Sequence, residues 1–184
     1  MKPTVLILVG LPGCGKTTAS NFFREKNIPV VRMGDFTDEI LKEYNLPFTA
    51  QNEKKIREKL RAKYGEDIYA KKTVERVIPL LKKSSIVVID GMRSKTELDY
   101  FNAHFPQIKL IFCEAEEKIR HERLMQRKDR PLDEMEARER DMSELSHLGL
   151  HTLRKSADFI INNNGTKQQL FLSLADIFKK LKSD

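Results

Sequence analysis

The feature that most constrains the fold of this chain is a continuous apolar run, Thr4–Val9, that leads directly into a glycine-rich bend. A run without polar alternation is typical of a strand buried on both faces, as in a parallel sheet covered by helices. After the bend "GLPGCGKT", at residues 10–17, the pattern continues as a helix over Thr17–Glu25. Parallel strands need long crossover connections, usually helices, so this opening predicts an alternating α/β chain.

The remaining sequence repeats this alternation of short apolar runs and helical patterns. Further strands are expected at Ile28–Arg32, Ser84–Gly91, Ile108–Cys113 and Ala157–Asn163. Helices are expected at Phe36–Tyr44, Glu53–Tyr64 and Asp67–Leu81, after Ser94, through the charged segment Glu116–Asp141 and after Thr166. These elements predict a three-layer α/β fold with a five-stranded parallel sheet and helices on both faces. A chain of 184 residues without a repeat or linker suits one domain.

Three residue pairs fit the capping box that starts a helix. The pairs are Ser94 with Glu97, Asp133 with Glu136, and Thr166 with Gln169. Pro131 is expected to stop the helix before the second pair, because the residue before a proline avoids the helical region. The last helix shows an apolar stripe that we expect to face the core. The stripe consists of Leu170, Leu172, Leu174, Ile177 and Leu181.

Composition excludes several classes of protein. With 40% hydrophobic and 33% charged residues, the chain is typical of globular proteins and not of disordered ones. No apolar run approaches the roughly 20 residues of a membrane span, and the first run stops at Gly10 without a cleavage pattern, so we expect a cytoplasmic protein. Cys14 and Cys113 are too few for a disulfide framework. His147 and His151 lie four residues apart without a third ligand nearby, so no metal site of histidines is expected.

The net charge of +7 favours anionic partners. Basic residues are interleaved with acidic ones, as in "EEKIRHERLMQRKDR", and aromatic residues make up only 8% of the chain. A small polyanionic substrate and RNA both fit this balance, so charge leaves the choice open.

The bend itself matches the phosphate-binding pattern G-x-x-x-x-G-K-[ST] through Gly10, Gly15, Lys16 and Thr17. Its position between a buried strand and a helix is the context that this P-loop motif requires, so we expect it to bind ATP. Main-chain amides and the helix N-terminus would hold phosphates, Lys16 would contact the β- and γ-phosphates, and Thr17 would ligate Mg²⁺. The predicted ATP-binding residues are Gly10, Leu11, Pro12, Gly13, Cys14, Gly15, Lys16, Thr17 and Thr18. Cys14 fills a variable position, and its place at a helix start suggests an oxidisable thiol that bound ATP would protect.

Three further residues follow strands whose carboxyl ends should meet the P-loop. Asp90, at the end of "VVIDG", is expected to hold Mg²⁺ directly or through water. Asp35, in "VVRMGDF", is expected to contact an acceptor hydroxyl, to orient Mg²⁺ or to cap the next helix. Arg93, in "DGMRS", is expected to bind a second anionic group beside the γ-phosphate. A second anion site predicts phosphoryl transfer rather than simple hydrolysis.

The charged segment after residue 116 is rich in arginine. Arg120, Arg123 and Arg127 recur every three or four residues and should share a helix face that closes over phosphates. A functional role is favoured for Arg123 and Arg127, whereas Arg120 and Arg130 are expected to be solvated and paired with glutamates.

The arrangement resembles the nucleoside monophosphate kinases, adenylate kinase above all, and also dephospho-CoA kinase. It is most similar to an uncharacterised archaeal P-loop family related to both. The resemblance rests on four segments that span nearly the whole chain. They are "GLPGCGKT", "VVRMGD", "VIDGMRS" and "ADFIINNNGT". It implies an acceptor-binding helical region over residues 34–82 and a short helical lid over residues 116–142.

The same resemblance implies roles for single residues. It would place Arg93 on the acceptor phosphate, Arg123 against the adenine, Arg127 against the ATP phosphates and Arg140 at the transferring phosphate. Beside the adenine it would place Asn163, Asn164 and Gly165. The chain departs from adenylate kinase at the turn "MGD" and lacks an arginine in "FTDEILKEYN", and it lacks the Asp-Ala-Asp turn of dephospho-CoA kinase.

The activity expected from the sequence is ATP-dependent phosphorylation of a small nucleotide, most simply a nucleoside or deoxynucleoside monophosphate such as AMP, with Mg²⁺. Dephospho-CoA kinase activity is the alternative within the enzyme class. A nucleotide-dependent switch or RNA-associated ATPase is the alternative from another class, and the second anion site at Arg93 argues against it.

Overall fold

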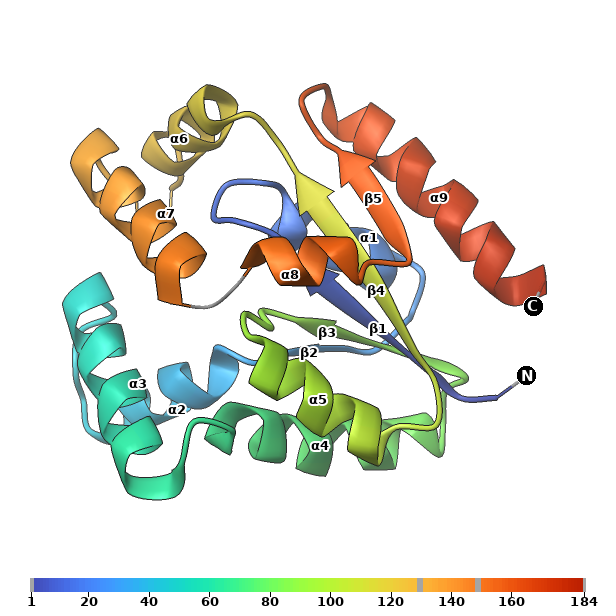
Figure 1. Ribbon diagram of the computed structural model, residues 1–184, viewed down its shortest axis with the longest axis horizontal. Helices are drawn as coiled ribbons and strands as arrows, with labels where there is room; N and C mark the ends of the chain where they lie inside the picture. Colours follow the sequence, from blue (N-terminus) through green and yellow to red (C-terminus); the bar gives the residue numbers. More distant parts are fainter. Residues whose placement is uncertain (1, 129–130, 148–149, 184) are drawn as a thin grey trace.

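A parallel sheet of five strands forms the centre of the computed structural model, which describes residues 2–128, 131–147 and 150–183 (Figure 1). The strands are β1 (Thr4–Val9), β2 (Val30–Arg32), β3 (Ile86–Asp90), β4 (Ile108–Glu114) and β5 (Phe159–Asn162). Their spatial order is β2-β3-β1-β4-β5, so the first strand lies in the middle. It pairs in parallel with β3, Ile7 opposite Ile89, and with β4, Ile7 opposite Leu110.

Helices cover both faces of this sheet, and others extend from its carboxyl edge. The first five helices are α1 (Lys16–Glu25), α2 (Asp35–Glu43), α3 (Ala50–Tyr64), α4 (Ile68–Leu81) and α5 (Lys95–His104). The rest are α6 (Glu117–Met125), α7 (Glu134–His147), α8 (Leu150–Lys155) and α9 (Lys167–Ser183). Figure 1 shows α2 and α3 on one side of the open edge and α6 and α7 on the other.

The alternation of side chains along β1 separates two hydrophobic cores. Val5, Ile7 and Val9 belong to the core beneath α4, α5 and α8. Leu6 and Leu8 belong to the core beneath α1 and α9. Every residue of β1 is buried, as the continuous apolar run predicted. The three-layer α/β fold predicted from the sequence is therefore confirmed.

Most predicted elements coincide with the observed ones to within a few residues. The capping boxes are also present: in each pair the side chains and main-chain N–H groups bond reciprocally, as at Asp133 and Glu136 (2.9 and 2.8 Å). Two details were wrong. The short helix α8 was not predicted, and Leu172 of the supposed core stripe is 61% exposed. Two residues beyond Leu170 correspond to about 200° of helix rotation, so Leu172 points away from the buried side.

Within the described residues, no helix is both long enough and apolar enough to cross a membrane. The same residues contain no group of three or more histidine, cysteine or acidic side chains that would hold a metal ion. His151 is among the residues to which this statement applies, whereas the side chain of His147 lies outside the described part of the structure.

Candidate functional site

The carboxyl ends of the five parallel strands lie at one edge of the sheet, and a crevice of about 920 Å³ opens there beside the ends of β1, β2 and β3. The P-loop after β1 lines its floor, and α2, α3, α6 and α7 contribute to its walls. Because β1 lies between β3 and β4, the crevice begins where the strand order reverses, which is the usual ligand position in open α/β sheets.

The P-loop has a backbone shape that only glycine tolerates. Gly13 and Gly15 have φ angles of 79° and 107°, in the left-handed region. A Cβ atom on Gly13 would lie 2.4 Å from the carbonyl oxygen of Arg120, and one on Gly15 would lie 2.2 Å from Nδ2 of Asn163. Gly15 is also the N-cap of α1 and makes no side-chain cap bond, and the first amides of a helix that begins in this way can bind an anion.

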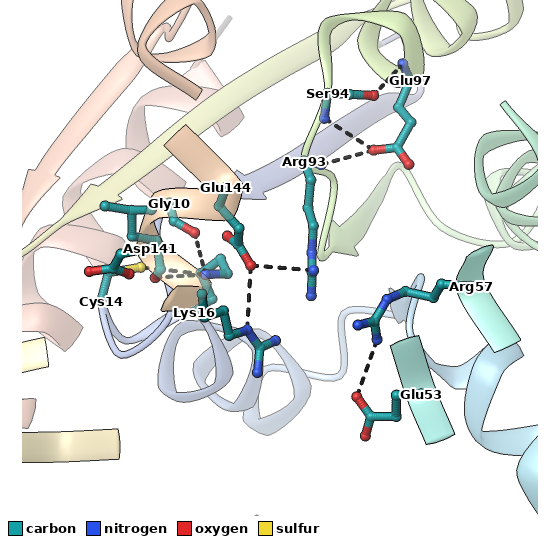
Figure 2. Close-up of polar contacts among 12 residues, drawn as sticks. Gly10, Cys14, Lys16, Glu53, Arg57, Arg93, Ser94, Glu97, Asp141 and Glu144 are labelled. Carbon is teal, nitrogen blue, oxygen red and sulfur yellow. Dashed lines mark hydrogen bonds and ion pairs between the residues drawn. The ribbon is translucent and has the colours of Figure 1, made fainter. Parts of the chain in front are cut away.

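Lys16 lies within this loop. Its Nζ donates hydrogen bonds to the carbonyl oxygens of Gly10 (2.5 Å) and Leu11 (3.0 Å) and lies 3.6 Å from Sγ of Cys14 (Figure 2). Cys14 is fully buried, so the expectation of a reactive thiol that ATP would protect from reagents is wrong. Lys16 and the neighbouring Thr17 and Thr18 line the crevice.

Asp90 ends β3 beside the first turn of α1. Its Oδ2 accepts a hydrogen bond from Oγ of Ser20 (2.9 Å), and both side chains are buried. Ser20 was missed in the sequence, although its position three residues after Thr17 places it on the same helix face. The carboxylate of Asp90 and the hydroxyl of Thr17 line the crevice together and are oxygen donors, which suit Mg²⁺ shared with substrate phosphates.

On the other side of the crevice, Arg57, Arg93 and Arg140 form what we call the arginine cluster. They come from α3, from the loop after β3 and from α7. Figure 2 shows Arg57 and Arg93 approaching each other from opposite elements. Arg57 pairs with Glu53 of the same helix (3.3 Å).

The charges of these guanidinium groups affect one another. Burial lowers the pKa of Arg57, and the positive charge of Arg93 lowers it further. The pKa of Arg140 is lowered by the same two causes, while the carboxylate of Glu144 opposes the shift. Arginine remains charged at neutral pH, so like charges held together create a positive potential that favours an anion.

The loop that carries Arg93 is fixed by its own helix cap. Oε2 of the buried Glu97 accepts hydrogen bonds from the main-chain N–H groups of Arg93 (2.9 Å) and Ser94 (3.2 Å). Its other oxygen, Oε1, lies 3.6 Å from Arg61, and burial raises the pKa of Glu97. The capping box therefore also positions the proposed anion-binding arginine.

Asp35 lines the same crevice as Arg93. It is the first residue of α2, and Gly34 occupies the N-cap, so the structure does not support Asp35 as the side-chain cap. Instead Arg32 pairs with Asp35 (2.7 Å) and with Asp38 (2.8 Å). Thus the carboxylate of Asp35 already accepts a charged hydrogen bond.

Arg120 was expected to be solvated, and this expectation is wrong. It is buried, pairs with both carboxylate oxygens of Asp141 (2.8 and 2.7 Å) and donates to the carbonyl oxygen of Pro12 (3.1 Å). His121 Nε2 lies 2.9 Å from the same carboxylate. This buried network joins the P-loop to α7, the helix that carries Arg140. The other arginine expected to be solvated, Arg130, lies outside the described residues.

The remaining predicted residues lie in or next to α6 and in the segment that follows β5. Arg123 lines the crevice and donates to the carbonyl oxygen of Gly165 (3.2 Å). Arg127 also lines the crevice, but it is exposed and lies beyond the end of α6. Arg120, Arg123 and Arg127 therefore do not share one helix face, contrary to the prediction. Asn163 is buried and donates from Nδ2 to the carbonyl oxygen of Cys14 (2.8 Å), which braces the P-loop. Asn164 bonds with Glu116 in both directions (2.8 and 3.0 Å).

Solved structures of similar fold indicate the structural class of this protein. The fold is similar to a shikimate kinase from Bacteroides thetaiotaomicron (TM-score 0.62, 16% identity, 97% of this chain and 98% of that one). It is also similar to a sugar kinase from Janibacter sp. HTCC2649 (TM-score 0.60, 14% identity, 96% of each chain). The protein therefore has the P-loop kinase fold.

Sequence comparison then gives the family. Residues 6–143 match a family model described as an AAA domain. The chain is 33% identical to a UPF0200 protein from Thermococcus onnurineus over 181 residues, which cover 96% of this chain and 97% of that one. It is 36% identical to a UPF0200/UPF0201 protein from Archaeoglobus fulgidus, of which the match covers 55%. The chain belongs to the UPF0200 family, an archaeal P-loop family as the sequence resemblance indicated.

Proposed function

We propose that this protein transfers the γ-phosphate of ATP to a small acceptor that carries an anionic group, most simply a nucleoside or deoxynucleoside monophosphate such as AMP. The observation that supports this most directly is that one crevice is lined by both the P-loop and the arginine cluster. A protein that only hydrolysed ATP would have no use for a second anion site in that crevice. The kinase fold of the structural relatives agrees with this class of reaction.

In the proposed reaction, an oxygen of the acceptor attacks the γ-phosphorus, and the bond from that phosphorus to the bridging oxygen of ADP breaks. The P-loop amides and Lys16 hold the phosphates and neutralise the charge that spreads over the transferred group. Thr17 and Asp90 are the residues that would hold Mg²⁺, and the ion would supply positive charge against the phosphates. Arg93, Arg57 and Arg140 would hold the anionic group of the acceptor near the attacking position.

A phosphate monoester is the acceptor that best fits the groups in the crevice. Its oxygen already carries negative charge at neutral pH and needs no general base. A hydroxyl acceptor, as in dephospho-CoA or a sugar, must lose a proton during transfer. From the sequence, Asp35 was the carboxylate expected to contact an acceptor hydroxyl. In the structure it pairs with Arg32 (2.7 Å), which makes it a poorer proton acceptor.

We further propose that residues 34–82 bind the acceptor and that residues 116–142 act as a lid. The described parts of these segments, with α2 and α3 on one side and α6 and α7 on the other, flank the crevice (Figure 1). Closure of α6 and α7 toward α3 would exclude water and bring Arg123, Arg127 and Arg140 onto the phosphates.

The test is a transfer assay with ATP and Mg²⁺ against a panel of acceptors, with products separated by anion-exchange chromatography. The panel contains ribo- and deoxyribonucleoside monophosphates, dephospho-CoA, shikimate and gluconate. We expect one nucleoside diphosphate to form for each ATP converted to ADP, which with AMP gives two ADP, and Lys16→Ala controls for contaminating kinases. Transfer only to dephospho-CoA would reverse our order of acceptors. RNA binding at physiological salt without transfer to any acceptor would support the switch instead.

A further inference from the structure

Glu144 is a buried carboxylate shared by two arginines of the proposed acceptor site. Its Oε1 lies 3.3 Å from Nη1 of Arg93 and 3.5 Å from Nε of Arg140, and its side chain is only 6% exposed. Figure 2 shows the carboxylate reaching from α7 toward Arg93. Two guanidinium groups from different elements thus converge on one oxygen, which is the geometry of an oxyanion-binding site.

The position of Glu144 in α7 explains why its carboxylate points into the crevice. It follows Asp141 by three residues, and Asp141 is held toward the P-loop by Arg120 (2.7 Å). Residues three apart share a helix face, so the contact that anchors α7 also directs Glu144 inward. Glu144 lines the crevice together with Arg57, Arg93 and Arg140.

A carboxylate and a terminal phosphate present similar oxygens to a guanidinium, but they differ in charge. A carboxylate carries one negative charge, whereas a phosphate monoester carries almost two at neutral pH. Three partly buried arginines surround this site, and burial followed by the positive charge of Arg93 lowers the pKa of Arg57 and Arg140. One carboxylate therefore neutralises the cluster less completely than a phosphate would.

We infer that Glu144 is an internal competitor for the oxyanion of the acceptor. Its carboxylate holds Arg93 and Arg140 together, and a phosphate monoester displaces it because the phosphate brings more charge and more acceptor oxygens. Glu144 thereby sets the selectivity of the site, since a group with a single charge gains little by replacing it. This inference deepens the proposed function and depends on it for the identity of the acceptor, although not for the presence of the oxyanion site.

The experiment measures binding by isothermal titration calorimetry without ATP, so that the readout does not depend on turnover. Wild type and Glu144→Gln are titrated with AMP, with inorganic phosphate and with adenosine, which lacks the anion. Removing the competing charge should lower the Kd for AMP and for phosphate by about tenfold, the effect of one charge-assisted hydrogen bond. The Kd for adenosine should not change. Glu139→Gln, which removes the same charge from an exposed position of α7, should behave as wild type in all three titrations.

A fold control keeps the result interpretable. Because Glu144→Gln leaves the partly buried Arg93 and Arg140 without this counter-charge, we expect a lower melting temperature that phosphate raises more in the variant than in wild type. Glu144→Asp, which keeps the charge but shortens the reach, should bind AMP with an intermediate Kd. An equal phosphate effect on the stability of both proteins would count against displacement.

Unchanged or weaker binding of AMP and phosphate by folded Glu144→Gln overturns the inference, because the carboxylate would then support the ligand rather than compete with it. If this occurs while wild type phosphorylates AMP, the inference fails and the proposed function stands. If phosphate binds Glu144→Gln more tightly but wild type phosphorylates no nucleoside monophosphate, the inferred oxyanion site is supported and the proposed acceptor is wrong.

Discussion

The two anion-binding regions of the crevice are built in opposite ways. The P-loop uses one contiguous segment, residues 10–18, and presents main-chain amides on a backbone that Gly13 and Gly15 make possible. The arginine cluster uses side chains from three separate elements, and each arginine faces a carboxylate, as Arg57 faces Glu53 and Arg93 faces Glu144. The first region has a fixed shape without counter-ions, and the second consists of ion pairs that a ligand has to exchange.

This difference separates two tasks. Amides fixed by the fold bind phosphate without regard to what the phosphate is attached to, and such a site suits a common donor such as ATP. Paired side chains bind only ligands whose contacts offset the loss of the internal partner, so in the proposed reaction discrimination between acceptors would reside there. The buried contact of Arg120 with Pro12 and Asp141 connects the two regions.

Breaking this connection should have the largest effect. Asp141→Ala leaves the buried Arg120 without its carboxylate, and loss of one partner of a buried ion pair costs about 3–5 kcal/mol. For a chain of this size that corresponds to a fall of roughly 10 °C in the melting temperature, measured by calorimetry. The matched control is Asp176→Ala, at an exposed position of α9, where we expect almost no change. Equal melting temperatures for the two variants would show that the network does not hold α7 to the P-loop.

Lys16→Ala tests the donor region alone. The ammonium group contacts only loop carbonyl oxygens and the Cys14 sulfur among the bonds described, so its loss should affect phosphate binding more than folding. We expect kcat to fall by about 10²–10³-fold, as when one group that stabilises the transition state is removed. The melting temperature should stay close to that of wild type, and Lys118→Ala, on an exposed part of α6, provides the matched control. A loss of stability as large as the loss of rate would mean that Lys16 is mainly structural.

The same contrast explains what could be predicted from the sequence. A buried strand, a glycine-rich bend and a helix occur in one stretch, so the P-loop and the alternation of strands and helices were recognised from local patterns alone. The capping box at Ser94 also depends on neighbours in the sequence, and it formed as predicted. Features built from neighbouring residues, such as the P-loop and this capping box, can therefore be recognised in the sequence.

The acceptor side depends on contacts between distant segments. Arg57 lies in a helix with many charged residues, and nothing in its spacing distinguishes it from the exposed Lys55 or Lys59. Arg120 looked like a solvated charge because its partner Asp141 is 21 residues away, beyond the break at Pro131. Glu144 could have been suspected only from its position four residues after Arg140 and three after Asp141, a spacing that many surface helices share.

Arg93→Ala tests the acceptor region. Its removal takes away a charge-assisted contact with the acceptor, so we expect the acceptor KM to rise by about 10–100-fold while the Kd for ATP stays within about twofold. Arg76→Ala serves as the control, since Arg76 pairs with Glu39 on the surface and does not line the crevice. A matching loss of ATP affinity would contradict the division of the crevice into two regions.

The smallest effect concerns the loop that positions Arg93. Burial raises the pKa of Glu97, so the folded state binds its proton more tightly than the unfolded state does. Stability from this group is therefore fully present below its unfolded pKa and is lost as the pH rises through its folded pKa. Glu97→Gln keeps an oxygen for the N–H groups of Arg93 and Ser94 but cannot ionise, so the free energy of unfolding of the variant relative to wild type should increase with pH across that interval and then level off. Urea titrations between pH 4 and pH 8 measure this difference, in which the common contributions of the other carboxylates cancel. A relative free energy that decreases with pH would mean that Arg61 stabilises the charged form more than burial opposes it, and the Arg93 loop would then resemble the paired arginine cluster rather than a fixed main-chain site.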